Sequence, residues 1–248
     1  IEIGATLVSF LILLTMKFHY QTTYSNSGKV NASSNFKKAF HYLHQRPLIL
    51  ELIVIAMVAN FLMASFDIGM PYLIVAQLHD SNQLVGILGA GISTGISLGS
   101  LLSSFSNSEH HFTQKLIAAF IITGLMTVGL GLTAMLATNP LWLGVIGFTI
   151  MLVTGIAVAV INVTTSVYLQ KSIPTYMLGR IFSMLQTGSL AITPIGTLVY
   201  TFLFKITSNG AQIFIWSGLF LIVYLLILAH QLQVNFKRDT QFLKAEIQ

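Results

Sequence analysis

Long apolar runs separated by shorter polar segments dominate the sequence. A membrane-spanning helix needs about 20 predominantly apolar residues, and seven runs fit this requirement. We predict spanning helices at Ile1–Phe18, Leu48–Ala76, Gln83–Phe105, Leu116–Ala137, Leu141–Leu169, Ile181–Phe204 and Ala211–Leu232. The pattern therefore predicts an all-α membrane protein with seven transmembrane helices.

The predicted connections differ in length and charge. The turns Gln77–Asn82 and Thr138–Pro140 are short and lack Lys and Arg, whereas the segments Ser106–Lys115, Gln170–Arg180 and Gln233–Gln248 are basic. Lys and Arg gather on the cytoplasmic side of membrane proteins. One side would hold Lys17, Lys29, Lys37, Lys38, Arg46, Lys115, Lys171, Arg180, Lys237, Arg238 and Lys244, and the other side only Lys205. We expect a multi-pass protein of the cell membrane with a cytoplasmic C-terminus.

The long connection Gln21–Arg46 has two parts. Gln21–Asn35 is rich in polar residues, whereas Phe36–Arg46 places Phe36, Phe40 and Leu43 at helical spacing. The second part predicts a short amphipathic helix, which either joins two helical bundles or lies on the membrane surface. Pro47 then occupies a favourable position for the start of the next helix.

Composition agrees with a bilayer environment and narrows the chemistry. Hydrophobic residues make up 54% of the chain and charged residues 8%, against about 25% charged in soluble domains. This balance excludes an ordinary soluble enzyme, a disordered tail and a nucleic-acid-binding protein. Cysteine is absent, so disulfides and thiolate ligands are excluded. The histidines form no metal-binding spacing and no catalytic motif occurs, so we expect no enzyme activity, metal or cofactor.

Glycines form a regular stripe in the third run. Gly91, Gly95 and Gly99 recur every four residues, a spacing at which small residues let helix backbones approach closely. The stripe predicts a helix–helix contact, either a fixed packing surface or an interface that slides during a change of shape.

Two acids lie in the second run. Asp67 is near its outer end, before Gly69 and Pro71, where the helix is expected to loosen. Intramembrane carboxylates are costly and mark ion or proton paths, so Asp67 is a candidate for proton coupling; an acid at headgroup level is the alternative. Glu51 lies near the cytoplasmic end, where we expect an interfacial ion pair.

Polar residues also interrupt the later runs. Asn60, Asn162 and Gln186 are amides within apolar sequence, and Pro194 is expected to break or kink the sixth run. Such groups either line a substrate cavity or bond neighbouring helices.

The segment Tyr168–Ser183 (YLQKSIPTYMLGRIFS) resembles the cytoplasmic loop between the tenth and eleventh helices of major facilitator superfamily exporters, and is most similar to the macrolide-efflux and siderophore-exporter branch. Asn60–Gln77 resembles the seventh helix of that branch, Gly91–Gly99 its eighth, and Phe36–Pro47 the segment between its two six-helix halves. The resemblance gives Arg180, with Gly179, a gating or anchoring role. The family's charged pattern after the eighth helix is absent from Gly99–His111, so we do not expect charged residues of this loop to hold the cytoplasmic side closed.

The resemblance implies a division of the chain at residues 20, 46 and 233. Residues 1–20 would be the last helix of an N-terminal half, 21–46 the interdomain loop, 47–233 the C-terminal six-helix bundle and 234–248 a cytoplasmic tail. The first run lacks a preceding basic segment, unlike a signal peptide, and we interpret the chain as part of a longer protein.

The function that the resemblance implies is proton-coupled efflux of a hydrophobic drug or related small molecule by alternating access, in a bacterial membrane. The partners would be the bilayer, an N-terminal six-helix half, the substrate and protons, with Asn60, Asn162, Gln186 and Pro194 facing the cavity. The glycine stripe would contact the N-terminal half. The alternatives are an inactive truncated protein, a half-transporter that needs a partner chain, and a seven-helix receptor. The receptor is disfavoured because the last run has no Lys for a retinal Schiff base.

Overall fold

A computed structural model describes Thr15, Phe40 and residues 42–77, 82–105, 112–136 and 139–246, without the side chains of Ala76, Gln77, Pro140 and 242–246. The chain divides into the units Ile1–Phe36 and Lys37–Gln248, and the structure below is that of the second unit. The first predicted span and the segment Gln21–Asn35 lie outside the described residues, apart from helical Thr15.

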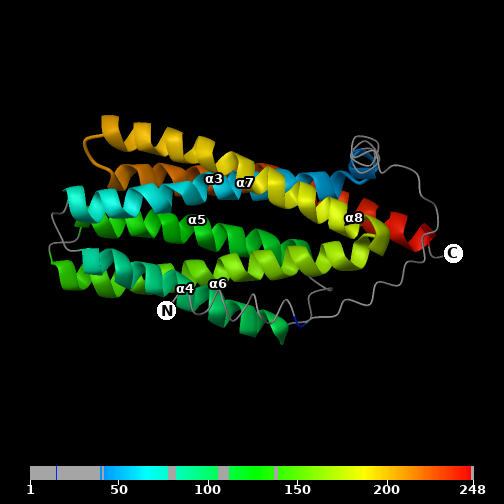
Figure 1. The fold of residues 1–248 in the computed structure, drawn as a ribbon, viewed down its shortest axis with the longest axis horizontal. Coiled ribbons are helices and arrows are strands. Elements are labelled where there is room, and N and C mark those ends of the chain that lie inside the picture. The colour runs from blue at the N-terminus through cyan, green and yellow to red at the C-terminus, as the bar shows by residue number, and fades with distance from the viewer. Residues whose placement is uncertain are drawn as a thin grey trace. The chain divides into compact units, whose positions relative to one another are not determined.

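Helices account for all the regular structure in the described ranges (Figure 1). Six of them are long and apolar enough to cross a membrane, which confirms the six runs predicted from Leu48 onward. The elements are α3 (Pro47–Pro71), the π-helix η1 (Tyr72–Gln77), α4 (Asn82–Ser104), α5 (Phe112–Leu136), α6 (Pro140–Ser172), α7 (Thr175–Ile206) and α8 (Ala211–Glu246). The starts of α3, α5 and α7 and the ends of α4, α6 and α8 lie at one end, named here the basic end because it carries Arg46, Lys115, Lys171 and Arg180.

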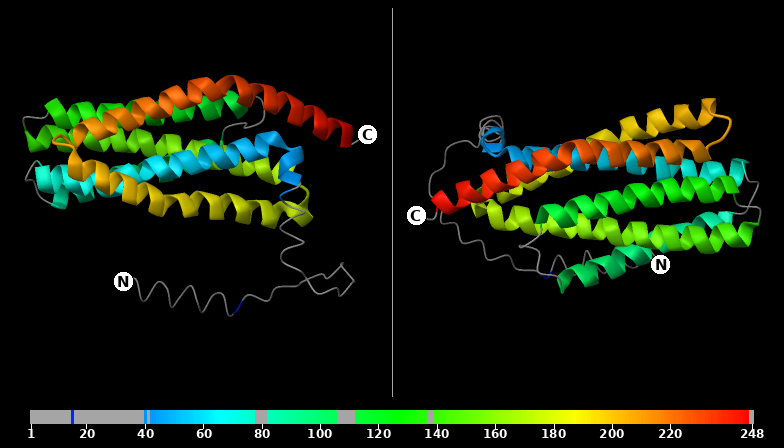
Figure 2. Two further views of the ribbon diagram at one scale, coloured as in Figure 1. Left: turned by 90° about the horizontal axis from the view of Figure 1, so that it is seen from above. Right: turned by 180° about the vertical axis from the view of Figure 1, so that it is seen from behind.

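Helix ends at the basic end differ from the sequence prediction. The predicted loop Gln170–Arg180 is reduced to Ile173 and Pro174, because α6 runs to Ser172 and α7 begins at Thr175. Ile173 is extended, as is favoured before a proline. The predicted tail after Gln233 is helical as far as Glu246, so that α8 extends past its neighbours (Figure 2). Hydropathy located the spans, but the amphipathic sequence beyond them continues the helices.

The helices pack in a repeating pattern. α3 packs on α7, and in the same way α6 packs on α4. α5 contacts α6, and in the same way α8 contacts α3. α5 and α8 pack on each other. Replacing α3, α4 and α5 by α6, α7 and α8 therefore reproduces the same set of neighbours. Because successive helices alternate in direction, α3 runs away from the basic end and α6 runs toward it. The chain thus contains two successive sets of three helices, α3–α5 and α6–α8, which have opposite orientations and pack mainly against each other.

The glycine stripe of α4 packs against α6. Leu84, Leu88, Gly91, Gly95 and Gly99 are the buried residues of α4. A Cβ atom added to Gly95 would lie 2.1 Å from the Leu152 carbonyl oxygen of α6. The hypothesis that this stripe contacts an N-terminal half is therefore wrong: α6 already covers it, because small residues on both helices let their backbones touch.

The end of α3 opposite the basic end is irregular, as the sequence predicted. The α-helix ends at Pro71 and continues as η1, since proline lacks the N–H group that an α-helix requires. A Cβ atom on Gly69 would lie 2.3 Å from Cζ of Phe204 and 2.6 Å from Cζ of Phe214. Glycine here lets the aromatic side chains of α7 and α8 pack directly on α3.

α7 is continuous through Pro194, which corrects the expectation of a broken helix. A proline in a helix removes one backbone hydrogen bond, and packing on α3 holds α7 together at this level. Gly196 is buried, and a Cβ atom there would lie 2.9 Å from the Phe61 carbonyl oxygen of α3.

The predicted amphipathic helix is described only in part. Residues 42–45 are helical. Leu43 is buried and belongs to the hydrophobic core, whereas Phe40 is exposed. The two residues, which the sequence placed on one apolar face, therefore have different surroundings.

Candidate functional site

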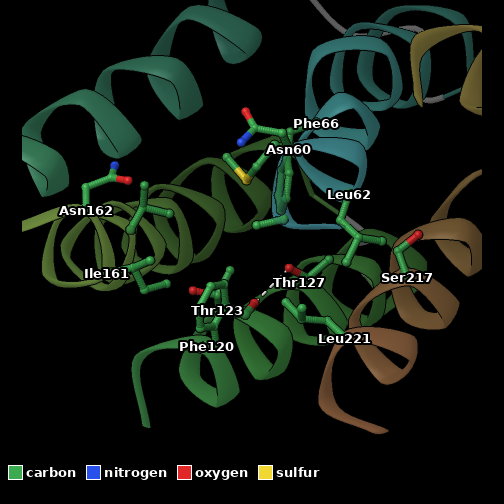
Figure 3. A pocket seen from close by; sticks show the side chains of 13 residues that line it. Asn60, Leu62, Phe66, Phe120, Thr123, Thr127, Ile161, Asn162, Ser217 and Leu221 are labelled. Atoms are coloured by element: carbon green, nitrogen blue, oxygen red, sulfur yellow. Dashed lines mark hydrogen bonds between the residues drawn. The ribbon is translucent and has the colours of Figure 1, made fainter. Parts of the chain in front are cut away.

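A cavity of about 240 Å³ lies inside the six-helix bundle. α3 packs on α8, α8 on α5 and α5 on α6, whereas α3 and α6 have few contacts with each other. Figure 3 shows the lining side chains converging from these four helices. They are Ala59, Asn60, Leu62, Met63 and Phe66 of α3, Phe120, Thr123 and Thr127 of α5, Val158, Ile161 and Asn162 of α6, and Ser217 and Leu221 of α8.

Much of the hydrogen-bonding capacity of the lining is used within the protein. Thr123 donates to the Ala119 carbonyl oxygen at 2.9 Å, and Thr127 donates to that of Thr123 at 2.7 Å. The hydroxyl of Ser217 is bonded to that of Tyr200 at 2.9 Å. Since each threonine proton is engaged, the capacity that these two hydroxyls retain is as acceptors. They suit a ligand that donates a hydrogen bond.

Two amides complete the polar lining. Asn60 Nδ2 donates to the Ala56 carbonyl oxygen at 2.9 Å, which leaves its second N–H and its Oδ1 available. Asn162 is exposed, and its side chain makes no hydrogen bond with the described residues. In Figure 3 Asn60 stands across the cavity from the threonines of α5, and Asn162 lies to one side on α6.

No Asp, Glu, Lys, Arg or His occurs among the 13 residues that line the cavity. An ionised ligand would therefore find no compensating charge in this part of the bundle, and burying an unpaired charge is costly. The cavity fits an uncharged, mainly apolar molecule with a small number of hydrogen-bonding groups.

The structure separates the residues that the sequence singled out. Asn60 and Asn162 line the cavity together. Gln186 and Pro194 are exposed on α7 and lie outside the cavity, and Asp67 is exposed on α3 near the opposite end from Arg46. Gln186, Pro194 and Asp67 lie on membrane-spanning helices, as predicted. The side of the helix on which each lies depends on helix packing, which the periodicity of the sequence alone does not determine.

Gly179 and Arg180 lie in the second turn of α7 rather than in a loop. Both are exposed, and a Cβ atom on Gly179 would meet nothing within 4 Å. The two residues therefore occupy an open surface at the basic end.

A buried polar cluster at the basic end was missed by sequence reasoning. Arg46 is only 1% exposed, and its Nε and Nη2 groups donate to the two carboxylate oxygens of Asp239 on α8. Nη1 donates to the Tyr42 hydroxyl at 2.8 Å and to the Ser172 carbonyl oxygen at 3.1 Å. Tyr168 of α6 donates to Asp239. This bidentate pair connects the start of α3 with the ends of α6 and α8.

The charge of Arg46 is secured by its partner. Burial by itself lowers the pKa of the guanidinium, but the hydrogen bonds and negative charge of Asp239 outweigh this effect and raise the pKa above its usual value. Aromatic rings enclose the pair: Phe112 lies 4.5 Å from the Tyr168 ring and 5.3 Å from the Phe236 ring, between centroids. The signals that could have revealed the cluster were an arginine just before Pro47 and an acid, Asp239, directly after Lys237 and Arg238.

Glu51 has a different partner from the one expected. It forms no salt bridge with a described residue; its Oε2 accepts a hydrogen bond from Asn235 Nδ2 of α8 at 2.9 Å. Its Oε1 is buried without a hydrogen-bond partner. The expected ion pair does not form because Arg46, one turn earlier, is engaged by Asp239.

Comparison of the chain with protein-family models, curated proteins and solved structures finds no match. The class of protein is defined by the architecture: six long apolar helices with an all-helical fold make the chain a multi-pass membrane protein.

Proposed function

We propose that residues 47–246 form the C-terminal six-helix bundle of a secondary transporter of the major facilitator type, which exports a small molecule by alternating access. The observation that carries the proposal is the exchange of α3–α5 with α6–α8, which reproduces the helix neighbours in the opposite orientation. Inverted three-helix repeats within a six-helix half are a property of this class of transporter. Tyr168–Ser183 supports the same assignment through its resemblance to the family.

The position of the cavity supports transport rather than a structural role. The cavity lies at mid-length of the bundle between α3 and α6, the first helices of the two repeats. Transporters built from inverted repeats bind substrate near the bilayer midplane at the repeat interface. The residues that line the cavity favour an uncharged, mainly apolar substrate, in agreement with efflux of a hydrophobic compound.

The exposed faces of α4 and α7 support a second helical bundle as partner. These are the two least buried of the six helices. Ser93, Ser97 and Ser100 are exposed on α4, and each hydroxyl donates to a carbonyl oxygen of the preceding turn. Small hydroxyl-bearing residues favour contact with other membrane helices. The glycine stripe does not contribute to this surface because it faces α6.

The basic end would face the cytoplasm, because it carries nearly all the Lys and Arg of the described residues. Substrate would then enter from this side, where the Arg46–Asp239 cluster links α3, α6 and α8, and leave at the end that carries Lys205.

A transport assay on the protein expressed from its complete reading frame tests the proposal. Cells would be loaded with a set of uncharged fluorescent hydrophobic dyes, and energised efflux would be compared with that of cells lacking the protein. Asn60→Leu removes an amide from the cavity, and Gln231→Leu is the matched control because Gln231 is an exposed amide of α8 outside the cavity.

We expect energised efflux of at least one dye. Losing one hydrogen bond of about 1 kcal/mol corresponds to roughly fivefold in affinity, so Asn60→Leu should raise KM about fivefold while Gln231→Leu leaves it unchanged. Equal efflux with and without the protein for every dye would contradict the transport proposal, and equal KM values in the two variants would remove the cavity from it.

A further inference from the structure

We propose that Glu51 is a proton-binding site, which carries a neutral carboxyl group in the conformation described and releases the proton when the basic end of the bundle opens. The binding of the proton follows from the geometry alone. The coupling of that proton to transport rests on the proposed function.

The surroundings of Glu51 favour the neutral form. It lies in the second turn of α3, beside the buried residues Leu48, Leu52 and Ile55. Its Oε2 accepts one hydrogen bond from Asn235, and its Oε1 is buried without a partner. Glu51 is partly buried, and a carboxylate that lacks a cation and leaves a buried oxygen unsatisfied is more costly there than a neutral carboxyl.

No cation in the described part of the chain compensates Glu51. Arg46 directs its donors to Asp239, Tyr42 and the Ser172 carbonyl oxygen. The other helices packed on α3 also carry titratable groups. On α7 these are the exposed Tyr176 and Arg180 at the basic end, and Tyr200 and Lys205 toward the other end. On α8 they are Tyr224, His230, Lys237, Arg238 and Asp239. α4 has no titratable residue, and Tyr72 of η1 lies at the far end.

Tyr224 of α8 interacts electrostatically with Glu51. Tyrosine carries no positive charge in either protonation state, so it cannot neutralise a carboxylate. The other two acids with described side chains differ from Glu51, because Asp67 is exposed and Asp239 is paired with Arg46. Glu51 is thus the described carboxyl that is partly enclosed without a cation.

When Glu51 is deprotonated, its carboxyl group becomes a carboxylate and the proton passes to water. α3 and α8 hold this group between them through the Glu51–Asn235 bond. Movement of α8 away from α3 at the basic end would admit water to Oε1 and favour the carboxylate. A group whose proton affinity differs between two conformations couples proton binding to the change between them.

Infrared difference spectroscopy of the protein in lipid nanodiscs, expressed from its complete reading frame, tests proton binding directly. The carbonyl band of a protonated carboxyl at neutral pH should be lost in Glu51→Gln and retained in Asp67→Asn, the matched control at an exposed acid. A wild-type minus Glu51→Gln spectrum with no such band at neutral pH would overturn the proposal.

Asn235→Leu provides a second measurement should Glu51→Gln fail to fold. This substitution removes the donor that favours the carboxylate, so the carbonyl band should persist to higher pH than in the wild type. A band that disappears at the same pH in both proteins would contradict the proposal.

The coupling is tested separately by transport. Glu51→Gln should reduce the stimulation of efflux by the proton gradient at least tenfold, while substrate binding is unchanged. A proton bound at Glu51 in a protein with no proton-dependent transport would refute the coupling and leave the binding site established.

Discussion

Replacement of Gly95 by alanine tests the packing of α4 on α6. The added Cβ atom would lie 2.1 Å from the Leu152 carbonyl oxygen and 3.0 Å from the Gly155 Cα atom. Close carbon–oxygen approaches in proteins are about 3.3–3.6 Å, so the two backbones would have to separate by roughly 1.2 Å or more. Both obstructing atoms belong to the backbone of α6, and no side chain can rotate away to make room.

The separation would weaken the whole α4–α6 interface. Every buried residue of α4 lies on one stripe. At the start of this stripe Leu84 packs against Gly144 of α6, and Leu88 packs against Gly147. A gap of 0.5–1 Å already loses a quarter to a half of the dispersion energy of the atoms affected. Inserting atoms into a well-packed site costs about 1–3 kcal/mol, and we expect Gly95→Ala to lower the free energy of unfolding by this amount.

Gly89→Ala is the matched control on the same helix, because its Cβ atom would meet nothing within 4 Å. Alanine is favoured over glycine in helices by about 1 kcal/mol, so this variant should be as stable as the wild type or more stable. The assay is unfolding of the purified protein by increasing fractions of SDS in mixed micelles, followed by circular dichroism. Unfolding of Gly95→Ala and Gly89→Ala at the same SDS fraction would refute the packing argument.

The same unfolding assay tests three further features. Gly155→Ala should destabilise as Gly95→Ala does, and the double variant should cost less than the sum because both changes force apart the same backbones; additive values would contradict a shared contact. Arg46→Ala should cost about 3–5 kcal/mol by leaving Asp239 buried without a cation, and a cost below 1 kcal/mol would show that the pair is not buried within the protein. Tyr168→Phe should cost about 1.5–3 kcal/mol, the value of a hydrogen bond to a charged group, and an unchanged unfolding midpoint would place its hydroxyl away from the carboxylate.

The sequence predicted the helices from α3 to α8 because each contains an apolar run long enough to span a bilayer. Their ends were predicted less well at the basic end. Phe236 and Asp239 continue the face of Leu232 on α8 beyond its apolar run, and they pack against Tyr168 or Phe112 of the neighbouring helices. Such an extension depends on tertiary contacts, which hydropathy does not record.

The candidate site could be predicted in part. Asn60 and Asn162 were recognisable because an amide within an apolar run needs a polar neighbour, whereas Gln186 met the same criterion but lies outside the cavity. The partner of the glycine stripe was assigned wrongly because spacing indicates close packing without identifying the second helix. Arg46 and Asp239 are separated by 193 positions, so only the fold brings them together.

The most direct test of the central claim uses the natural absence of cysteine from the chain. A single cysteine in place of Asn60 would be introduced into the protein expressed from its complete reading frame, with any cysteines outside this sequence replaced, and treated with membrane-impermeant thiol reagents from each side of sealed vesicles. Alternating access predicts labelling from both sides, with a ratio that changes when substrate or a proton gradient is applied. Labelling from one side only, or from neither, under all of these conditions would contradict the account.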